Sequence, residues 1–413
     1  MPTSPATRPR WWPRFTSPLR ASAVTARLGR VLGVAIAVCF VTGLLSETQY
    51  HPLSWAPWPV APASLYRVTQ GVHVVVGTLC IPLVLVKLWS VYPRLFRFPP
   101  ARSVRHVLER GSVALLVAAT LVQLVTGYLN SLNWYPFRWY FVDTHHYLAY
   151  VVAGSVLLHV AVKLPEILHG LRTPVEQDAP LLEPEPTPEP TPEPTPGPTP
   201  GPTGEWTPVP AAAADGAGIT RRGLLAATGA GLSVVAVTTV GQALTPLEPV
   251  GLLAFRQGTR GPQRVPVNRT AEQAEVATLA TAATWVLQVD GATSFQLTLD
   301  DLAAQDGAAH EARFPIACVE GWSVGASWRG LRLLDLVRRA GGDASSSVQV
   351  FSLEPVGAYN QSVITGPQLS AALLATHLNG ERLDLDHGYP LRLIAPNRAG
   401  VLNTKWLSRV VVS

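Results

Sequence analysis

The strongest constraint on how this chain folds is a series of five apolar runs. Each is close to the ~17–25 residues that cross a bilayer as a helix. The runs lie at residues 28–46, 68–91, 111–129, 146–164 and 223–244. Apolar residues make up 47% of the 413-residue chain and charged residues only 14%, a balance typical of membrane segments joined to a globular part. We therefore expect a multidomain protein with an all-α transmembrane region.

The basic residues indicate how these spans are oriented. They gather before the first and third runs, as Arg8, Arg10, Arg14, Arg20, Arg27 and Arg30, and as Arg94, Arg97, Arg102, Arg105 and Arg110. The loops 47–66 and 131–143 are aromatic instead and carry almost no Lys or Arg. By the positive-inside rule, the basic segments, including residues 1–27, are cytoplasmic and the aromatic loops lie outside. The net charge of +5 is thus a topology signal in a multi-pass bacterial cell-membrane protein, which contacts lipid and not nucleic acid.

The first four spans read as a loose duplication. "FVTGLLS" at 40–46 ends the first span and "LVTGYLN" at 124–130 ends the third. Each is followed by an aromatic loop and a span that carries histidine. Two such helix hairpins predict a four-helix bundle over residues 28–170, a natural place for a cofactor.

Histidines inside spans are functional candidates. His73 lies near the outer end of the second span, and His145 and His146 open the fourth, so His73 faces either of them at similar depth. His159 follows His145 by 14 residues, about 21 Å deeper, but the matching position after His73 is Lys87. The pattern resembles membrane cytochromes b and implies one haem b near the outer face, with a second left open. The alternative is a haem-free bundle whose histidines are interfacial or hydrogen-bonded.

A linker and a fifth helix follow the bundle. Residues 171–218 include the acidic, Pro-rich "EPEPTPEPTPEPTPGPTPGPTG" at 183–204, which predicts an extended spacer. Arg221 and Arg222 then open the apolar segment 219–245, which reads as a twin-arginine export signal or as an ordinary membrane helix with basic flanks. Either way, residues 246–413 lie outside.

Residues 246–413 are long enough to build a core of their own. "WVLQVDGATSFQLTLDDL" predicts two strands around the turn Asp290–Gly291. "VQVFSLEP", "PLRLIAP" and "WLSRVVVS" predict further strands, whereas "GLRLLDLVRRAGG" and "GPQLSAALLATHLNG" predict helices. The outer domain is therefore expected to be α+β.

Cys318 is the only cysteine in this domain. The other two cysteines, Cys39 and Cys80, lie in apolar runs, so Cys318 has no obvious disulfide partner. It is an inert buried thiol, a reactive thiol or a metal ligand.

Two stretches together decide among these roles. "FPIACVEGWSVGASWRGLRLLDLV" and "LNGERLDLDHGYPLRLIAPNRAGVLNTKWLSRVVV" contain Cys-Val-Glu-Gly-Trp, a Trp-Arg-Gly that would start a helix, His-Gly-x-Pro-Leu-Arg and Lys-Trp, in that order. Over roughly residues 260–413 this set resembles the sulfite oxidase family of molybdopterin enzymes. The resemblance implies that the Cys318 thiolate binds molybdenum, which accepts a soft sulfur ligand.

The resemblance also assigns further residues of the site. It implies that His387 and Arg392 contact the phosphate and ring of the molybdopterin, and that the segment Asn403–Lys405, with Thr404, holds it. Asn268 is a weaker match at the start of the domain. Tyr359 would donate a hydrogen bond near the metal, and Trp322 and Arg329 would line the substrate pocket. Each could instead be an ordinary polar or half-buried residue.

These observations predict a membrane-anchored molybdenum oxidoreductase. It would act on a small, sulfite- or sulfoxide-like substrate outside the membrane and exchange electrons with quinone or quinol through the haem. One alternative is a cofactor-free, degenerate binding module on a structural anchor, and another is a haem-only quinone oxidoreductase, which leaves Cys318 unexplained. The substrate and the direction of electron flow stay open.

Overall fold

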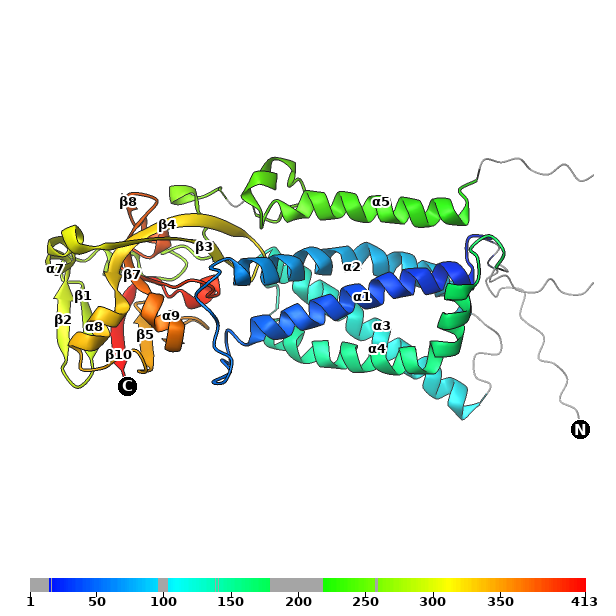
Figure 1. Cartoon of the computed structure of the whole chain (residues 1–413), viewed down its shortest axis with the longest axis horizontal. Helices are drawn as coiled ribbons and strands as arrows, with labels where there is room; N and C mark the ends of the chain where they lie inside the picture. Colours follow the sequence, from blue (N-terminus) through cyan, green and yellow to red (C-terminus); the bar gives the residue numbers. More distant parts are fainter. Residues whose placement is uncertain are drawn as a thin grey trace, which may run out of the picture.

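The computed structural model describes residues 15, 17–95, 103–137, 139, 141–178, 218–256 and 259–413. Its long helices lie together at one end of the elongated molecule and the sheets lie at the other (Figure 1). Most of the predicted linker, together with Arg8, Arg10, Arg14, Arg97 and Arg102, lies outside the described residues.

Five helices are long and apolar enough to cross a membrane, as predicted. They are α1 (Ser22–Glu47), α2 (Leu65–Leu95), α3 (Val104–Ser131), α4 (Phe141–Arg172) and α5 (Arg221–Val240). Each begins before its apolar run. At most 28% of the most apolar stretch of any of them is buried within the protein. Apolar side chains on most of the helix surface are therefore exposed, which is typical of helices that lie in a membrane.

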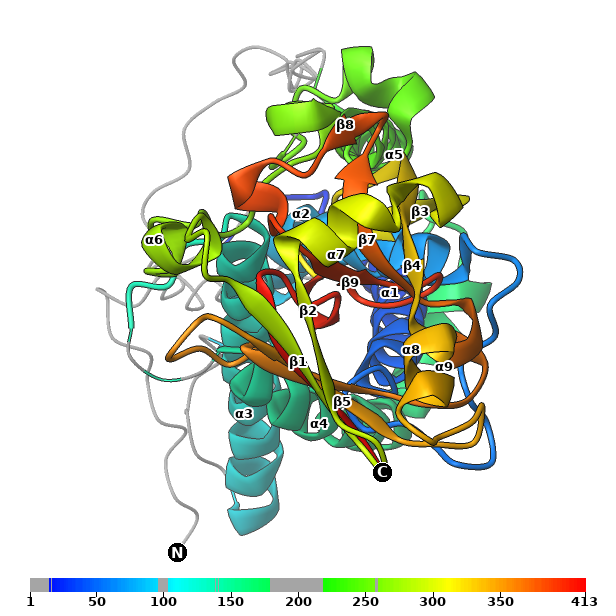
Figure 2. The same ribbon diagram turned by 90° about the vertical axis from the view of Figure 1, so that its left-hand side faces the viewer.

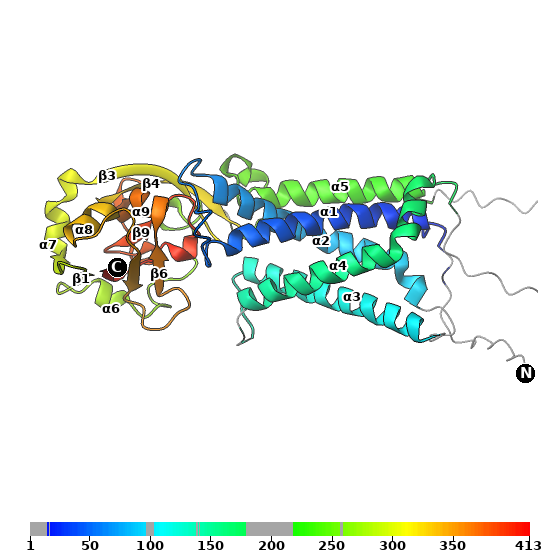
Figure 3. The same cartoon turned by 60° about the horizontal axis from the view of Figure 1, so that its bottom comes forward.

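The helices pack as two hairpins and a flanking helix. Helix α1 packs on α2 and α4, and α3 packs on α4 and α2. Helix α5 runs beside α2 (Figure 3). The paired arginines fix its start: Arg221 donates from Nε to the Pro18 carbonyl (2.8 Å) and from Nη1 to the Val175 carbonyl (2.9 Å). Arg222 pairs with Glu176 (2.6 Å), so both arginines have structural partners.

The C-terminal domain contains two sheets, seen end-on in Figure 2. The first has the order β2-β1-β10-β5-β6 and the second β3-β4-β7-β8, with β9 paired to β7. Their strands are β1 (Val286–Asp290), β2 (Phe295–Thr298), β3 (His310–Ala317), β4 (Ser323–Arg332), β5 (Val348–Ser352), β6 (Gln361–Ile364), β7 (Leu373–Leu378), β8 (Glu381–Arg382), β9 (Arg392–Ile394) and β10 (Leu407–Val412). Short helices α6 (Ala277–Ala280), α7 (Leu299–Ala304), α8 (Leu333–Arg339) and α9 (Gly366–Ala371) connect them.

Most of the local predictions for this domain are confirmed. Strands β1 and β2 form the predicted hairpin, and β5, β9 and β10 fall on the predicted strand segments. The main core joins the first sheet to α8, through residues such as Leu287, Leu333 and Val350.

Two local predictions are wrong. "GPQLSAALLATHLNG" forms only the short helix α9 before it turns into strand β7. Strand β7 is central in its sheet and nearly all buried, and such strands are continuously apolar, which hides their period. The Trp-Arg-Gly segment 328–330 lies in β4 and does not start a helix; α8 begins three residues later.

Polar side chains join the membrane-helix region to the C-terminal domain. Gln49, just after α1, donates to the Asn397 carbonyl (2.9 Å), and Gln70 of α2 donates to the Val319 carbonyl (2.8 Å). The Asn397 side chain in turn donates to the carbonyls of Pro59 and Pro62 (2.8 and 2.7 Å). These bonds hold the loop between α1 and α2 against Asn397, and hold α2 against Val319, the residue that follows Cys318.

Candidate active site and a histidine pair

Cys318 occupies a tight turn between two long strands. Strand β3 ends at Ala317 and β4 begins at Ser323, and the Cys318 amide donates to the Trp322 carbonyl (2.9 Å) to close the turn. Gly321 sits in this turn at φ +94°, a conformation that favours glycine. Only 1% of Cys318 is exposed, and burial, followed by the nearby Glu320 carboxyl, raises the pKa of its thiol.

A small pocket beside Cys318 gathers most of the predicted cofactor residues. Asn268, Trp322, His387, Arg392 and Lys405 line it together with Cys318. They come from distant parts of the domain: Arg392 from β9, His387 from a short 3-10 turn, and Lys405 from the segment just before β10. Three groups that can be cationic thus converge on one thiol.

Burial disfavours the charged form of each of these three groups. It lowers the pKa of Arg392 to about 10 and, with Arg392 nearby, the pKa of His387 to about 4 and that of Lys405 to about 7. His387 Nε2 donates to the Pro262 carbonyl (2.8 Å), and Lys405 Nζ donates to the Arg269 and Asp386 carbonyls. A bound anion would relieve this mutual destabilisation of buried positive charge.

Arg392 also has unused hydrogen-bonding capacity. Its Nη1 donates to the His387 carbonyl (3.2 Å) and its guanidinium lies over the Trp328 ring (5.6 Å). Its Nε is buried and has no partner among the described residues. Buried polar atoms without partners are rare, and here the orphaned donor points to a missing acceptor. The chemistry of these residues suits a phosphate-bearing cofactor that supplies sulfur ligands to a metal, although the free volume of the pocket is only about 10 Å³.

Other predicted site residues are used within the fold. Asn403 accepts from the Ala395 amide (3.1 Å) and Thr404 Oγ1 lies 2.7 Å from Ser362 Oγ, so neither side chain lines the pocket. The prediction that Arg329 lines the substrate pocket is corrected by the structure. Arg329 pairs with Asp306 (2.6 Å) and does not line the Cys318 pocket. Because side chains alternate along β4, Trp328 faces Arg392 and the neighbouring Arg329 faces the other way.

Tyr359 lies beside Cys318 but on another side of it. It belongs to a cluster of aromatic and apolar side chains that includes Ala317 and Val319, and its ring is 6.1 Å from that of Tyr50. Tyr50 and Tyr66 come from the membrane-helix region and were not predicted as site residues. Glu320 was also missed, although it lies in the quoted motif: it accepts from Trp322 Nε1 (2.9 Å) and pairs with Arg256 (3.1 Å).

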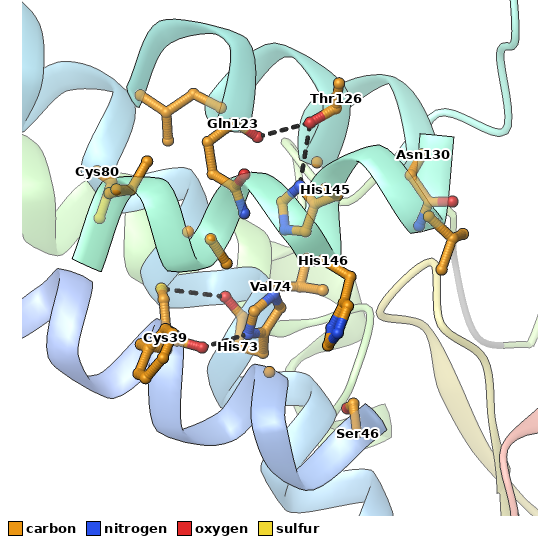
Figure 4. Close-up of a pocket in the computed structure, with 18 of the residues that line it drawn as sticks. Cys39, Ser46, His73, Val74, Cys80, Gln123, Thr126, Asn130, His145 and His146 are labelled. Carbon is orange, nitrogen blue, oxygen red and sulfur yellow. Dashed lines mark hydrogen bonds between the residues drawn. The ribbon is translucent and has the colours of Figure 1, made fainter. Parts of the chain in front are cut away.

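A second cavity, of about 220 Å³, lies among the ends of α1 to α4 that are nearer the C-terminal domain. His73 of α2 and His145 of α4 face one another in it, with ring centroids 6.1 Å apart and planes at 75° (Figure 4). Two imidazoles bound through Nε2 to one metal ion, at about 2 Å each, would place the centroids roughly 6 Å apart. The spacing of the pair would thus suit two imidazole ligands of one metal ion.

The repeated Thr-Gly pairs set the orientation of both rings. Thr42 Oγ1 lies 3.1 Å from His73 Nδ1, and Thr126 Oγ1 lies 3.0 Å from His145 Nδ1. Each threonine hydroxyl donates to a carbonyl one turn earlier, so it accepts the proton on Nδ1 and leaves Nε2 with a free lone pair.

The glycines allow the rings to approach the helices. A Cβ at Gly43 would lie 3.2 Å from His73 Cε1, and one at Gly127 would lie 3.0 Å from His145 Cε1. The two hairpins therefore present equivalent Thr-Gly-His units.

The remaining histidines differ from this pair. His146 lines the same cavity (Figure 4), but its Nδ1 pairs with Glu47 (3.3 Å) and its ring packs on Tyr147 and Tyr150. His159 is deeper in α4 and does not line the cavity. Lys87 donates to the Thr25 carbonyl (2.6 Å) where a partner for His159 would be needed. No group of three or more His, Cys, Asp or Glu side chains able to hold a metal occurs in the described part of the chain.

The C-terminal domain, which holds this site and both sheets, is similar to parts of known proteins. Residues 273–413 match the family model described as "Oxidoreductase molybdopterin binding domain". Mouse mitochondrial sulfite oxidase is 31% identical over 155 residues, which are 31% of this chain and 28% of that protein. Barley nitrate reductase [NAD(P)H] is 38% identical over 107 residues, 22% of this chain and 12% of that enzyme. An uncharacterized oxidoreductase of Bacillus subtilis is 30% identical over 124 residues, 30% of this chain and 62% of that protein.

Residues 273–413 therefore form a domain of the molybdopterin-binding type found in oxidoreductases, similar to part of the sulfite oxidases. The resemblance seen in the sequence is confirmed for this part of the chain. The chain spans less than a third of the length of the mouse sulfite oxidase and less than two thirds of the Bacillus protein.

Proposed function

We propose that this protein is a membrane-anchored molybdenum oxidoreductase that acts on a small oxygen-bearing substrate and exchanges electrons with quinone or quinol through a haem. The observation that carries this proposal is the buried thiol of Cys318 beside the cationic pocket of a molybdopterin-binding domain.

The chain's own residues would divide the work of holding the cofactor. Cys318 would give molybdenum a thiolate ligand, and Arg392, Lys405 and His387 would neutralise the phosphate. Bound there, molybdopterin supplies oxygen-atom or two-electron transfer. Trp322 and Trp328 wall the pocket and exclude water from it.

The histidine pair supports a haem b in the membrane region. His73 and His145 are the ligands we assign, because both have Nδ1 bonded and Nε2 available. His146 also has its Nδ1 bonded, to Glu47, but its ring packs on Tyr147 and Tyr150, whereas the His145 ring packs on His73. Lys87 in place of an inner histidine supports one haem and not two.

The junction between the two regions supports electron transfer between them. Val319, the residue after Cys318, lines the cavity that holds His73 and His145. Molybdenum chemistry in two-electron steps would thus lie next to a one-electron carrier, which quinone in the membrane could reach.

The orientation follows from the same arrangement. The aromatic loops and the C-terminal domain lie at one end of the helices, and the start of α1 lies at the other (Figure 1). With the basic segments in the cytoplasm, the catalytic domain is outside the bacterial membrane. The twin-arginine route would deliver it there already folded around its cofactor.

Metal analysis tests the proposal. Protein purified from its own membranes should contain one molybdenum and one iron per chain. Molybdenum without iron would remove the haem and require another electron partner. Neither metal in folded, exported protein would reject the proposal and favour the binding module.

A further inference from the structure

Two tyrosine hydroxyls beside the turn of Cys318 are buried without a hydrogen bond. Tyr50 follows α1 and Tyr66 is in the first turn of α2, so both belong to the membrane-helix region. Neither hydroxyl has a partner of normal hydrogen-bond geometry among the described residues, although Tyr359 lies near the first and Ser46 near the second. A phenol buried in this state loses its hydration without compensation, which natural proteins rarely tolerate unless a ligand supplies the partner.

Both phenols are close to the thiol that would bind molybdenum. Tyr66 is 1% exposed and packs in one cluster with Ala317 and Tyr359, and the Cys318 thiol is among the groups that interact with each phenol. A phenol with an ordinary pKa of about 10 is protonated at neutral pH, so both tyrosines are hydrogen-bond donors.

Cys318 thus has two chemically different surroundings. On one side is the pocket of Arg392, His387 and Lys405, built entirely by the C-terminal domain. On the other is the cluster of Tyr50, Tyr66 and Tyr359, which includes residues of both regions; Tyr50 also lines the cavity of His73 and His145. The cationic side suits the phosphate of the cofactor, so the phenolic side is left for the substrate.

We propose that Tyr50 and Tyr66 complete the substrate pocket at molybdenum and donate hydrogen bonds to an oxygen atom of the substrate. This inference rests on the proposed function and adds that the membrane region supplies part of the active site. Neutral phenol donors match a polarised oxygen on sulfur or nitrogen. The catalytic domain would then need the loop between α1 and α2 for substrate binding as well as for docking.

The test uses the full-length, metal-loaded protein with the variants Tyr50→Phe and Tyr66→Phe. Exposed Tyr147→Phe, in α4, is the matched control. The probes are dimethyl sulfoxide with a reduced viologen dye and sulfite with ferricyanide. Steady-state kinetics and the molybdenum(V) electron paramagnetic resonance spectrum are recorded with each probe. We expect KM to rise about three- to tenfold in each cluster variant, the range of one neutral hydrogen bond, with kcat changed less. The control should behave as wild type.

Thermal unfolding separates substrate binding from a structural role. Because neither hydroxyl has a partner in the free protein, both Phe variants should melt at or above the wild-type temperature. A lower melting temperature with unchanged KM would overturn the proposal, as would slower haem reduction at unchanged KM, which would assign the phenols to electron transfer. Molybdenum-loaded wild type that responds to neither probe also contradicts it. Loss of molybdenum from wild type itself would instead reject the proposed function.

Discussion

The two candidate cofactor sites are built on opposite physical principles. The Cys318 pocket gathers Arg392, Lys405 and His387 where burial disfavours their charge, and leaves Arg392 Nε without a partner. The histidine cavity is lined mainly by uncharged side chains, with Glu47 as the charged residue among them, and both facing rings have their Nδ1 atoms bonded to threonine. The first site is therefore suited to recognise an anion by charge, and the second to recognise a flat, apolar group by shape and ligand spacing.

The way each site is assembled also differs. The Cys318 pocket draws on residues more than a hundred positions apart, from Asn268 to Lys405. The histidine site repeats one short unit, in which a Thr-Gly pair on one helix meets a histidine on the next. We therefore predict that a substitution can abolish one site and leave the other intact, although Val319 lies between them.

The largest effect is expected from Cys318→Ser. Turnover should fall to background because a hydroxyl is a poor ligand for molybdenum, whereas the haem absorption band should stay at wild-type strength. Thermal unfolding should show little change, since a serine hydroxyl can accept the backbone hydrogen bonds that Val319 and Glu320 give to the Cys318 thiol. Wild-type turnover in this variant would reject the molybdenum site.

Replacement of His145 by Ala should remove the haem band and leave molybdenum in place. His146→Ala is the control, because the His146 ring pairs with Glu47 and is not the ring that packs on His73. The absorption spectrum and the iron-to-molybdenum ratio measure both. If His146→Ala loses the haem and His145→Ala keeps it, our ligand assignment is wrong.

Much of the fold could be predicted because it depends on local patterns. The five membrane helices follow from run length, and β1, β2 and β10 follow from alternation and a Gly turn. Strand β7 could not, because a fully buried strand and a helix of the same apolar composition look alike until the neighbouring strands are known.

The site residues likewise fall into those that the local sequence predicts and those that only the folded structure identifies. The ordered motif around Cys318 pointed to Arg392, His387 and Lys405, which the structure brings together. The choice between His145 and His146 depends on Glu47, and the exclusion of Arg329 depends on which face of β4 it takes. Tyr50 and Tyr66 were missed because only the docking of two regions brings them to Cys318.

The buried Lys405 of the Cys318 pocket predicts an unusual pH dependence of the protein's stability. Lys405 has a pKa of about 7 in the folded protein against an ordinary 10.5, so the unfolded chain binds more protons between these values. Without cofactor, stability should therefore rise as the pH increases from about 7 to 10, by at most about 1.4 kcal/mol per pH unit. Melting temperatures of cofactor-free full-length protein measure this slope.

Lys405→Met is the control for that slope. The variant should have a flatter pH profile because it lacks the buried titrating group. An equal slope in wild type and variant would show that Lys405 is not the cause. Cofactor loading should also flatten the wild-type profile, since the phosphate favours the charged lysine.

The smallest effect is expected from two threonine variants, which test whether the two Thr-Gly-His units are equivalent. Thr42→Val and Thr126→Val each remove a hydroxyl that holds a histidine Nδ1, and loss of such a partner weakens metal binding by roughly 10–100-fold. We expect both near the lower end, because a carbonyl one turn before each threonine, that of Cys39 or Gln123, can accept the Nδ1 proton instead. Haem titration of each variant measures the loss. Equal losses would support two matched ligands on one haem, whereas a loss confined to one variant would mean that only one histidine binds iron and that the likeness of the hairpins is structural.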